Sequence, residues 1–226
     1  MLRAVIFDFD GVITDSEILH YRAFNEILSQ FGIELTTKDY YTTYLGLNDV
    51  DCFGLLIEQG RLKAEIEQVP ALVGQKKVIF EVLAQSEGRI IEGVRDFLGM
   101  LEQNNVPMGI CSGTLRTEIE LILAEAKLRH LFSIIVSAEQ VHKGKPDPEG
   151  FLLTLSKLNE NGLQAIKGDE CVVIEDSRWG LEAAKAAGMH AVAVTNTYEA
   201  DQLGLADKIV SCLTELAIDD LQQVCK

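Results

Sequence analysis

The chain has 226 residues, a formal net charge of −15 and an apolar fraction of 47%. An apolar fraction of this size is enough for a packed interior and excludes disorder as the default state. The negative charge argues against binding to nucleic acid or to an anionic membrane surface. It would also repel an anionic substrate, so a site for an anion must carry its own local positive charge.

The five cysteines are an odd number without paired spacing, which argues against a disulfide framework. The first residues run directly into an apolar strand followed by acids, so we expect no signal peptide. No apolar run approaches the length of a membrane span. We therefore expect a cytoplasmic monomer whose partner is a small molecule.

The first predicted element is a strand from Ala4 to Phe7, a short apolar run with β-branched residues that is typical of a strand buried on both faces. Asp8 and Asp10 follow it, and Gly11 ends it. Because alternate residues of an extended chain share a face, we expect the two carboxylates to point the same way. Two carboxylates placed side by side repel each other, and they need a metal, a shared proton or water to offset the repulsion. For this motif alone, an ordinary Asp-Gly turn is the alternative.

Residues 15–88 carry helical patterns and no strand-like alternation. Asp15-Ser16 is a candidate helix N-cap. Three segments have apolar residues at helical spacing: Ile18 to Phe31, Asp49 to Gln59, and Pro70 to Gln85. A crossover between parallel strands usually needs only one helix. The block therefore predicts an all-helical domain, residues 15–88, inserted into a core of residues 1–14 and 89–226.

From Gly93 onward, strand and helix patterns alternate. The predicted strands are 107–111, 132–136, 171–174, 191–194 and 208–210. Such alternation predicts a parallel sheet with helices on both faces. The fold class is therefore α/β, with a doubly wound, Rossmann-like parallel-sheet core and an inserted all-helical domain.

Polar residues stand where four of these strands end. Asp8 and Asp10 follow the first strand, Ser112 the second, and Glu175-Asp176 the fourth, while Lys145 lies beyond the third. Each has an ordinary explanation alone: a helix cap, a solvated loop lysine, or acids that favour a helix start. Open parallel sheets, however, bind ligands at the carboxyl ends of their strands. The convergence of all these residues on one edge predicts a functional site there.

The order of these motifs resembles the haloacid dehalogenase superfamily over the whole chain: Asp8-Phe9-Asp10-Gly11-Val12, Ser112, Lys145-Pro146-Asp147-Pro148 and Glu175-Asp176-Ser177. The helical insertion resembles the cap of that superfamily. Within it, the stretch from Asp15 to His20 is similar to the group of β-phosphoglucomutase and related sugar-phosphate phosphatases. This resemblance makes His20 and Lys76 candidate cap residues for the substrate. The alternatives are a helix-surface or hinge histidine for His20 and, for Lys76, a solvated lysine beside Lys77.

The resemblance implies a mechanism of phosphoryl transfer. Asp8 would attack phosphorus and form an aspartyl-phosphate, which divides one difficult displacement into two easier ones. Asp10 would protonate the leaving oxygen and then activate the attacking water or hydroxyl. Dehalogenase members lack this second acid, so Asp10 favours phosphoryl transfer.

The resemblance also implies a phosphate site. Ser112 and the backbone N–H groups of Gly113 and Thr114, at a helix start, would hold the phosphoryl oxygens. Lys145 would neutralise developing charge and hold Asp8 in place.

A metal ion is implied as well. Asp8, Asp10, Glu175 and Asp176 against Lys145, four carboxylates against one ammonium group, leave three surplus negative charges before any substrate binds. Mg²⁺ suits such an all-oxygen site. The expected ligands are Asp8, the backbone carbonyl of Asp10, and Asp176, with Glu175 acting through water.

The leading hypothesis is a Mg²⁺-dependent phosphatase for a small phosphorylated metabolite, with a sugar phosphate preferred. The alternatives are a β-phosphoglucomutase-like phosphomutase and, in another class, a phospho-accepting signalling module. The signalling module has no use for Asp10 or for a cap. Where β-phosphoglucomutase-like sequences have a cap Gly-x-x-Arg, this chain has Gly46-Leu47-Asn48-Asp49. An acid thus replaces the arginine that would clamp a second phosphate, so hydrolysis is expected rather than mutase activity.

Overall fold

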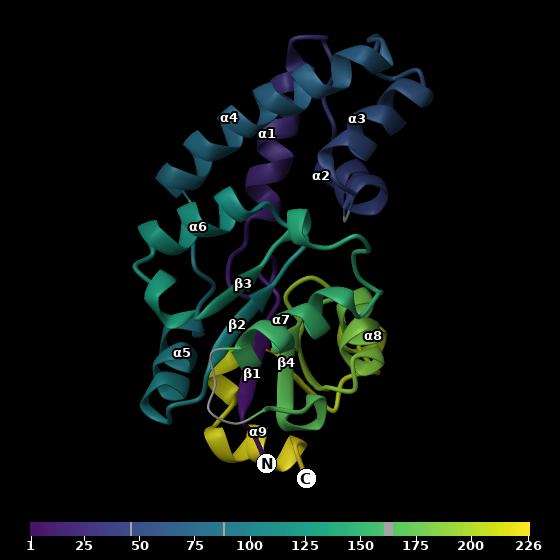
Figure 1. Cartoon of the computed structure of the whole chain (residues 1–226). Helices are drawn as coiled ribbons and strands as arrows, with labels where there is room; N and C mark the ends of the chain where they lie inside the picture. The colour runs from purple at the N-terminus through teal and green to yellow at the C-terminus, as the bar shows by residue number, and fades with distance from the viewer. Residues whose placement is uncertain (46, 88, 161–164) are drawn as a thin grey trace. The chain divides into compact units, whose positions relative to one another are not determined.

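The structure, a computed structural model, describes residues 1–45, 47–87, 89–160 and 165–226. The chain divides into two compact units, residues 1–15 with 89–226 and residues 16–88. We call them the core unit and the helical unit. Both can be followed by colour along the chain in Figure 1.

The core unit is built on a six-stranded parallel sheet in the order β3-β2-β1-β4-β5-β6 (Figure 1). The strands are β1 (Ala4–Phe7), β2 (Met108–Cys111), β3 (Ile134–Val136), β4 (Cys171–Glu175), β5 (His190–Val194) and β6 (Lys208–Val210). This confirms the α/β fold class with a doubly wound parallel sheet. The third strand begins two residues later than predicted, because Phe132 closes a short 3₁₀ turn by donating its N–H to Arg129.

The central position of β1 decides which residues meet. Phe7 is in register with Ile110 of β2 on one side and with Ile174 of β4 on the other. Because the strands are parallel, their carboxyl ends lie at one edge of the sheet. The chain reverses its direction across the sheet between β1 and β4, and ligands bind outside the strand ends at such a reversal.

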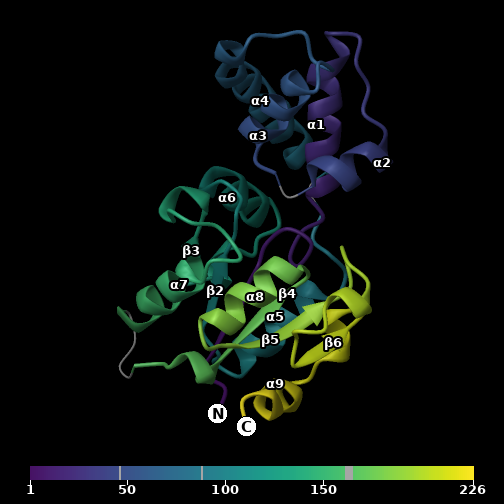
Figure 2. The ribbon, with the colours of Figure 1, turned by 90° about the vertical axis from the view of Figure 1, so that its right-hand side faces the viewer.

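Helices cover both faces of the sheet. They are α5 (Val94–Gln103), α6 (Arg116–Glu125), α7 (Glu149–Glu160), α8 (Arg178–Ala186) and α9 (Ile218–Val224), with 3₁₀ helices at Arg129–Leu131, Ala138–Gln140, Gly168–Glu170, Ala200–Gln202 and Leu213–Glu215. Figure 2 shows α7 and α8 on the side of the sheet nearer the viewer, where Phe151 and Leu181 join its apolar core. On the other face the ring of Phe97 meets Phe7 edge-on, with centroids 6.0 Å apart. The sequence patterns did not predict α9.

The helical unit contains α1 (Glu17–Ser29), α2 (Thr37–Asp39), α3 (Asp49–Glu58) and α4 (Val69–Glu87), with a π-helical turn at Tyr40–Tyr44 and a 3₁₀ turn at Ile66–Gln68. Its described residues include no strand. α4 packs against both α1 and α3. The rings of Phe24 and Phe53 lie 5.0 Å apart in the apolar cluster of this unit.

Two details of α1 differ from the sequence-based expectation. Ser16 precedes the helix, but its backbone is helical rather than extended and its side chain makes no capping hydrogen bond. The buried stripe runs through Leu19, Ala23, Phe24, Ile27 and Leu28. The outer positions of the predicted stripe, Ile18 and Phe31, are exposed. Of the described helices, none is both long and apolar enough to cross a membrane.

Candidate active site

Three buried carboxylates meet at the carboxyl ends of β1 and β4. One oxygen each of Asp8, Glu175 and Asp176 lies within 4.8 Å of the other two. The parallel register brings them together, since the N–H of Asp8 donates to the carbonyl of Ile174 at 3.0 Å. The three residues are 8%, 0% and 5% exposed respectively, so water compensates their charge only weakly.

Lys145 supplies positive charge to this cluster. Its Nζ lies 2.5 Å from Asp8 Oδ1 and 2.5 Å from Glu175 Oε1. It also lies 5.1 Å from the ring centroid of Phe151, on α7. Burial alone would lower the pKa of Lys145, but Asp8 and Glu175 outweigh burial and raise it. The alternative of a solvated loop lysine is therefore wrong.

The loop that presents Lys145 is fixed from the start of α7. Glu149 accepts hydrogen bonds from the backbone N–H groups of His142 at 2.9 Å and Lys143 at 3.0 Å. Asp147 accepts from the N–H of Glu149 at 3.0 Å, as an acid before a helix start does. The polar loop predicted from the sequence is thus anchored in a defined position.

The charge of the cluster is incompletely compensated by protein groups. Burial raises the pKa of Asp8 to about 7, with further contributions from Glu175 and Asp10 and opposition from Lys145. Burial, followed by the charge of Glu175, also raises the pKa of Asp176. Buried carboxylates that resist ionisation fit a divalent cation, which would offset their charge and take oxygen ligands.

The two oxygens of Glu175 are largely engaged with protein groups. Oε2 accepts from the N–H of Asp176 at 2.9 Å and from both the N–H and the hydroxyl of Ser177 at 2.8 Å. Oε1 accepts from Lys145. A Cβ at Gly180 would lie 1.7 Å from Oε1, so only glycine fits beneath this side chain. Glu175 is therefore better suited to holding Lys145 and the loop than to binding an ion directly.

Gly11 lets the loop after β1 approach Asp176. Its φ of +75° lies in the left-handed region, and a Cβ there would stand 1.9 Å from Asp176 Oδ2. The carbonyl of Gly11 accepts from Asn196 Nδ2 at 2.7 Å, and the side chain of Thr197 hydrogen-bonds Asp176. Asn196 and Thr197 were not among the site residues predicted from the sequence. The sequence feature that could have indicated them is their position as a polar pair just beyond the predicted strand 191–194.

A second polar group gathers around Asp10. The hydroxyl of Thr114 donates to Asp10 Oδ2, and Ser112 Oγ lies 3.5 Å from the same oxygen. The N–H of Thr114 donates to Ser112 Oγ at 3.0 Å. Gly113 and Thr114 precede α6, which begins at Arg116, so they form a turn before the helix rather than its first turn. The expectation of a helix start at Gly113 and Thr114 is corrected accordingly.

The candidate cap residues His20 and Lys76 contact each other within the helical unit. Lys76 is fully buried, and its Nζ lies 2.5 Å from His20 Nδ1 and 2.7 Å from Asp49 Oδ1. His20 stacks on Phe80 with ring centroids 4.1 Å apart. Burial and the neighbouring charge of Lys76 lower the pKa of His20. The alternative of a solvated lysine is therefore wrong, and the half-buried His20 packs its ring on Phe80 within the helical unit. Gly46 of the Gly46-to-Asp49 motif lies outside the described residues.

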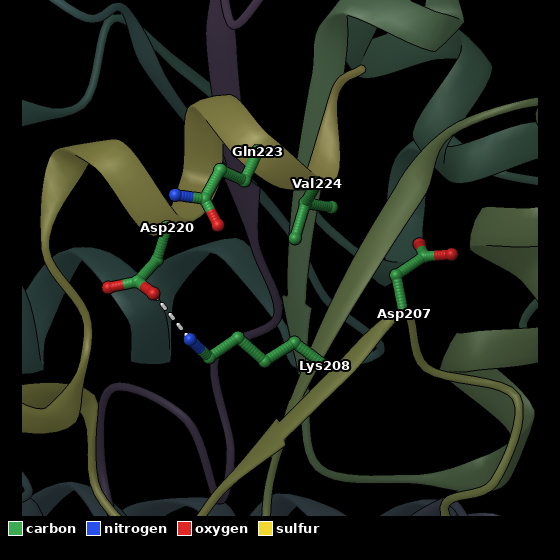
Figure 3. A pocket seen from close by; sticks show the side chains of 5 residues that line it. All are labelled: Asp207, Lys208, Asp220, Gln223 and Val224. Atoms are coloured by element: carbon green, nitrogen blue, oxygen red, sulfur yellow. Dashed lines mark hydrogen bonds and ion pairs between the residues drawn. The ribbon is translucent and has the colours of Figure 1, made fainter.

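A shallow pocket of about 360 Å³ lies at a different edge of the core unit (Figure 3). Its lining residues are Asp207, Lys208, Asp220, Gln223 and Val224. Lys208 begins β6, whereas Asp8 follows the end of β1, so the pocket is at the amino ends of the strands. Lys208 pairs with Asp220 at 2.5 Å, and Asp207 pairs with Lys185. These charges compensate each other, and we assign the pocket no part in the site.

The chain is similar to one known protein family and to several named proteins. The chain matches the family of haloacid dehalogenase-like hydrolases over residues 5–194, a range that includes Asp8, Asp10, Glu175 and Asp176. It is 31% identical over 193 residues to the phosphorylated carbohydrates phosphatase of Thermotoga maritima, covering 84% of each chain. It is 30% identical to the fructose-1-phosphate phosphatase of Escherichia coli, covering 84% of this chain and 95% of the other. The β-phosphoglucomutase structure from Clostridium difficile matches with a TM-score of 0.82 at 25% identity, over 100% of this chain and 97% of the other.

Proposed function

The chain belongs to the haloacid dehalogenase-like hydrolase family, as its motifs predicted, and is a phosphoric monoester hydrolase of that family. We propose that it hydrolyses a small phosphorylated metabolite, preferably a sugar phosphate. The observation that carries the proposal is the buried contact between Asp8 and Lys145 beside two further carboxylates. Two relatives named for phosphorylated carbohydrates and for fructose 1-phosphate support the substrate class.

Asp8 is the proposed nucleophile. One oxygen of its carboxylate would form a bond to phosphorus while the bond between phosphorus and the ester oxygen breaks, which gives an aspartyl-phosphate. Its backbone is fixed by the hydrogen bond to Ile174, and its Oδ1 is held by Lys145. Restricting the nucleophile in this way removes orientational freedom that would otherwise slow attack.

Asp10 is the proposed acid and base. It would give a proton to the leaving oxygen and later take one from the water that attacks the aspartyl-phosphate. It stands two residues beyond Asp8 and contacts the hydroxyl of Thr114. A phospho-accepting signalling module would have no need of this group.

Phosphate binding is assigned to the loop after β2 and to Lys145. Ser112, with the N–H groups of Gly113 and Thr114, would donate to phosphoryl oxygens, and Lys145 would offset their charge. In this structure the N–H of Thr114 donates to Ser112 Oγ. Because Ser112 Oγ accepts in that bond, its own proton stays available for donation, in this structure toward Asp10 Oδ2 at 3.5 Å and in the proposed function to a phosphoryl oxygen.

Mg²⁺ is the proposed cofactor, held by Asp8, the backbone carbonyl of Asp10, and Asp176, with Glu175 reached through water. The fit rests on the surplus charge of three buried carboxylates with oxygen ligands only. The ion would supply positive charge that offsets the phosphate and orients it. We further propose that residues 16–88 serve as the cap, with substrate selection by side chains of that unit.

The proposal is tested by assaying the purified chain with p-nitrophenyl phosphate and Mg²⁺, followed by a panel of phosphorylated metabolites scored for released phosphate. A phosphatase turns over repeatedly, whereas a signalling module would stop after one phosphoryl transfer. Absence of turnover on the aryl ester and on the whole panel would contradict the proposal.

A further inference from the structure

We propose that the side chain of Thr114 is a positioning residue that fixes the orientation of Asp10 for proton transfer. The inference rests on the proposed function, in which Asp10 acts as acid and base. It concerns the hydroxyl of Thr114 and is separate from any role of its backbone in holding phosphate.

The carrying observation is a hydrogen bond between residues 104 positions apart. The Oγ1 hydroxyl of Thr114 donates to Asp10 Oδ2. A hydrogen bond to a carboxylate is stronger than one between neutral groups, so the bond strengthens when Asp10 gives up its proton. It also restricts rotation of the carboxyl group of Asp10, which lies in the loop between the end of β1 and Gly11.

Thr114 is itself held rigidly, which a positioning residue requires. Its carbonyl accepts from the N–H of Ala138 at 3.1 Å, and its N–H donates to Ser112 Oγ at 3.0 Å until, in the proposed function, that N–H turns to a phosphoryl oxygen. As a β-branched residue it also has restricted rotation about χ1. The hydroxyl therefore has few orientations other than the one toward Asp10.

Ser112 approaches the same carboxylate oxygen but cannot take over this role. Its Oγ lies 3.5 Å from Asp10 Oδ2, at the limit of a hydrogen bond. In the proposed function its proton goes to a phosphoryl oxygen when substrate binds. Thr114 then remains as the donor that holds Asp10.

This arrangement assigns different tasks to the two oxygens of Asp10. Because Oδ2 accepts from Thr114, the proton that Asp10 transfers is carried by Oδ1. As Asp8 bonds to phosphorus, the bond between phosphorus and the ester oxygen breaks and its electron pair stays on that oxygen. The ester oxygen takes the proton from Oδ1, and Asp10 is left as a carboxylate.

The test compares two leaving groups in Thr114→Val. The p-nitrophenolate of p-nitrophenyl phosphate leaves without a proton, whereas the alkoxide of a sugar phosphate needs one. Since kcat/KM reports the steps up to alcohol release, we expect Thr114→Val to lose about tenfold in kcat/KM for the sugar phosphate and much less for the aryl ester. The loss should lie in kcat rather than in KM.

Three variants complete the experiment. Thr114→Ser keeps the hydroxyl and should restore the leaving-group pattern of the wild type, whereas Thr114→Ala removes it and should repeat the loss even if the valine variant folds poorly. Thr117→Val alters an exposed threonine on the adjacent helix and should change nothing.

The outcomes separate this inference from the function on which it rests. Equal losses on both esters, or no loss on either, would overturn the positioning role while leaving an active phosphatase. A wild-type chain inactive on both esters with Mg²⁺ would instead overturn the proposed function.

Discussion

The ammonium group of Lys145 lies 2.5 Å from Oδ1 of Asp8, although the two residues are 137 positions apart in the sequence. The same nitrogen lies 2.5 Å from Oε1 of Glu175. One cation is therefore shared by two buried carboxylates, and it fixes the position of Asp8, the proposed nucleophile, relative to Glu175. Removing it would leave both carboxylates uncompensated.

We accordingly expect Lys145→Met to lose activity by on the order of a hundredfold or more, because charge stabilisation and the position of Asp8 are lost together. The free energy of unfolding should fall by about 3 kcal/mol, the cost of breaking a buried ion pair by removing one partner. Steady-state kinetics and urea denaturation measure the two effects. The matched control is Lys143→Met, in the same loop and 75% exposed in its side chain. Activity of Lys145→Met within tenfold of wild type would contradict the shared role.

Asp8→Asn should abolish turnover, because the amide has no anionic oxygen with which to attack phosphorus. A loss on the order of a thousandfold or more is expected. Chelation by EDTA should have a comparable effect that added Mg²⁺ reverses. Asp96→Asn, an exposed acid in the first turn of α5, is the control. Substantial phosphate release by Asp8→Asn would assign the nucleophile to another group.

Mg²⁺ binding should weaken as the pH falls below about 7. The pKa of Asp8 is raised to about 7, chiefly by burial, so in the metal-free protein this group carries a proton below that pH. A metal ligand must be deprotonated, and because the pKa of Asp176 is raised as well, binding at pH 6 should release at least about one proton per ion, with less release at pH 8. Calorimetry in buffers of different ionisation enthalpy measures both quantities. An affinity that stays constant from pH 5.5 to 8 would show that Asp8 is ionised throughout.

Asp10 and Asp176 should respond differently to mutation. Asp10→Asn should lower turnover by about a hundredfold or more, the usual effect of losing a general acid–base group, with little change in Mg²⁺ affinity. Its expected metal contact is a backbone carbonyl, which the substitution retains. Asp176→Ala should weaken Mg²⁺ binding by at least about tenfold. Comparable losses of affinity in both variants would make Asp10 chiefly a metal ligand.

The arrangement at the sheet edge was predictable from the sequence because strand register decides it. Once Ala4 to Phe7 is a central parallel strand, Asp8 must end beside the residues that follow its neighbours, including Glu175 and Asp176. For Lys145, the same argument predicted only that it lies near this edge of the sheet. Its 2.5 Å contacts depend on the loop that Glu149 anchors.

Contacts between loops, and contacts between side chains on different helices, were not predictable from strand register. Thr197 reaches Asp176 because the turn after β5 folds back toward Gly11, and apolar periodicity contains no information on that path. The hydroxyl bond from Thr114 to Asp10 joins two loops for the same reason. Asp49 and Lys76 lie 27 positions apart on different helices, and no local pattern pairs them.

The pairing of Asp49 with Lys76 bears on the choice between phosphatase and mutase. A mutase must bind a second phosphate in the cap while the first is transferred, and a bidentate arginine suits that task. Here the candidate cap cation, Lys76, already has a carboxylate of Asp49 2.7 Å from its Nζ. Its charge is thereby compensated within the helical unit, and Asp49 would repel a second phosphate.

We therefore expect net hydrolysis when the enzyme receives β-glucose 1-phosphate with a catalytic trace of the 1,6-bisphosphate. Free phosphate should accumulate faster than glucose 6-phosphate, because an unclamped bisphosphate leaves before it can reorient and water takes the phosphoryl group from Asp8. Asp49→Asn removes the repelling charge and should lower the KM for the bisphosphate several-fold, about the effect of one screened charge interaction. Asp51→Asn, exposed and two residues along on α3, should leave the KM unchanged. Glucose 6-phosphate that accumulates faster than free phosphate in the wild type would show that another cationic group holds the second phosphate and that the chain is a mutase.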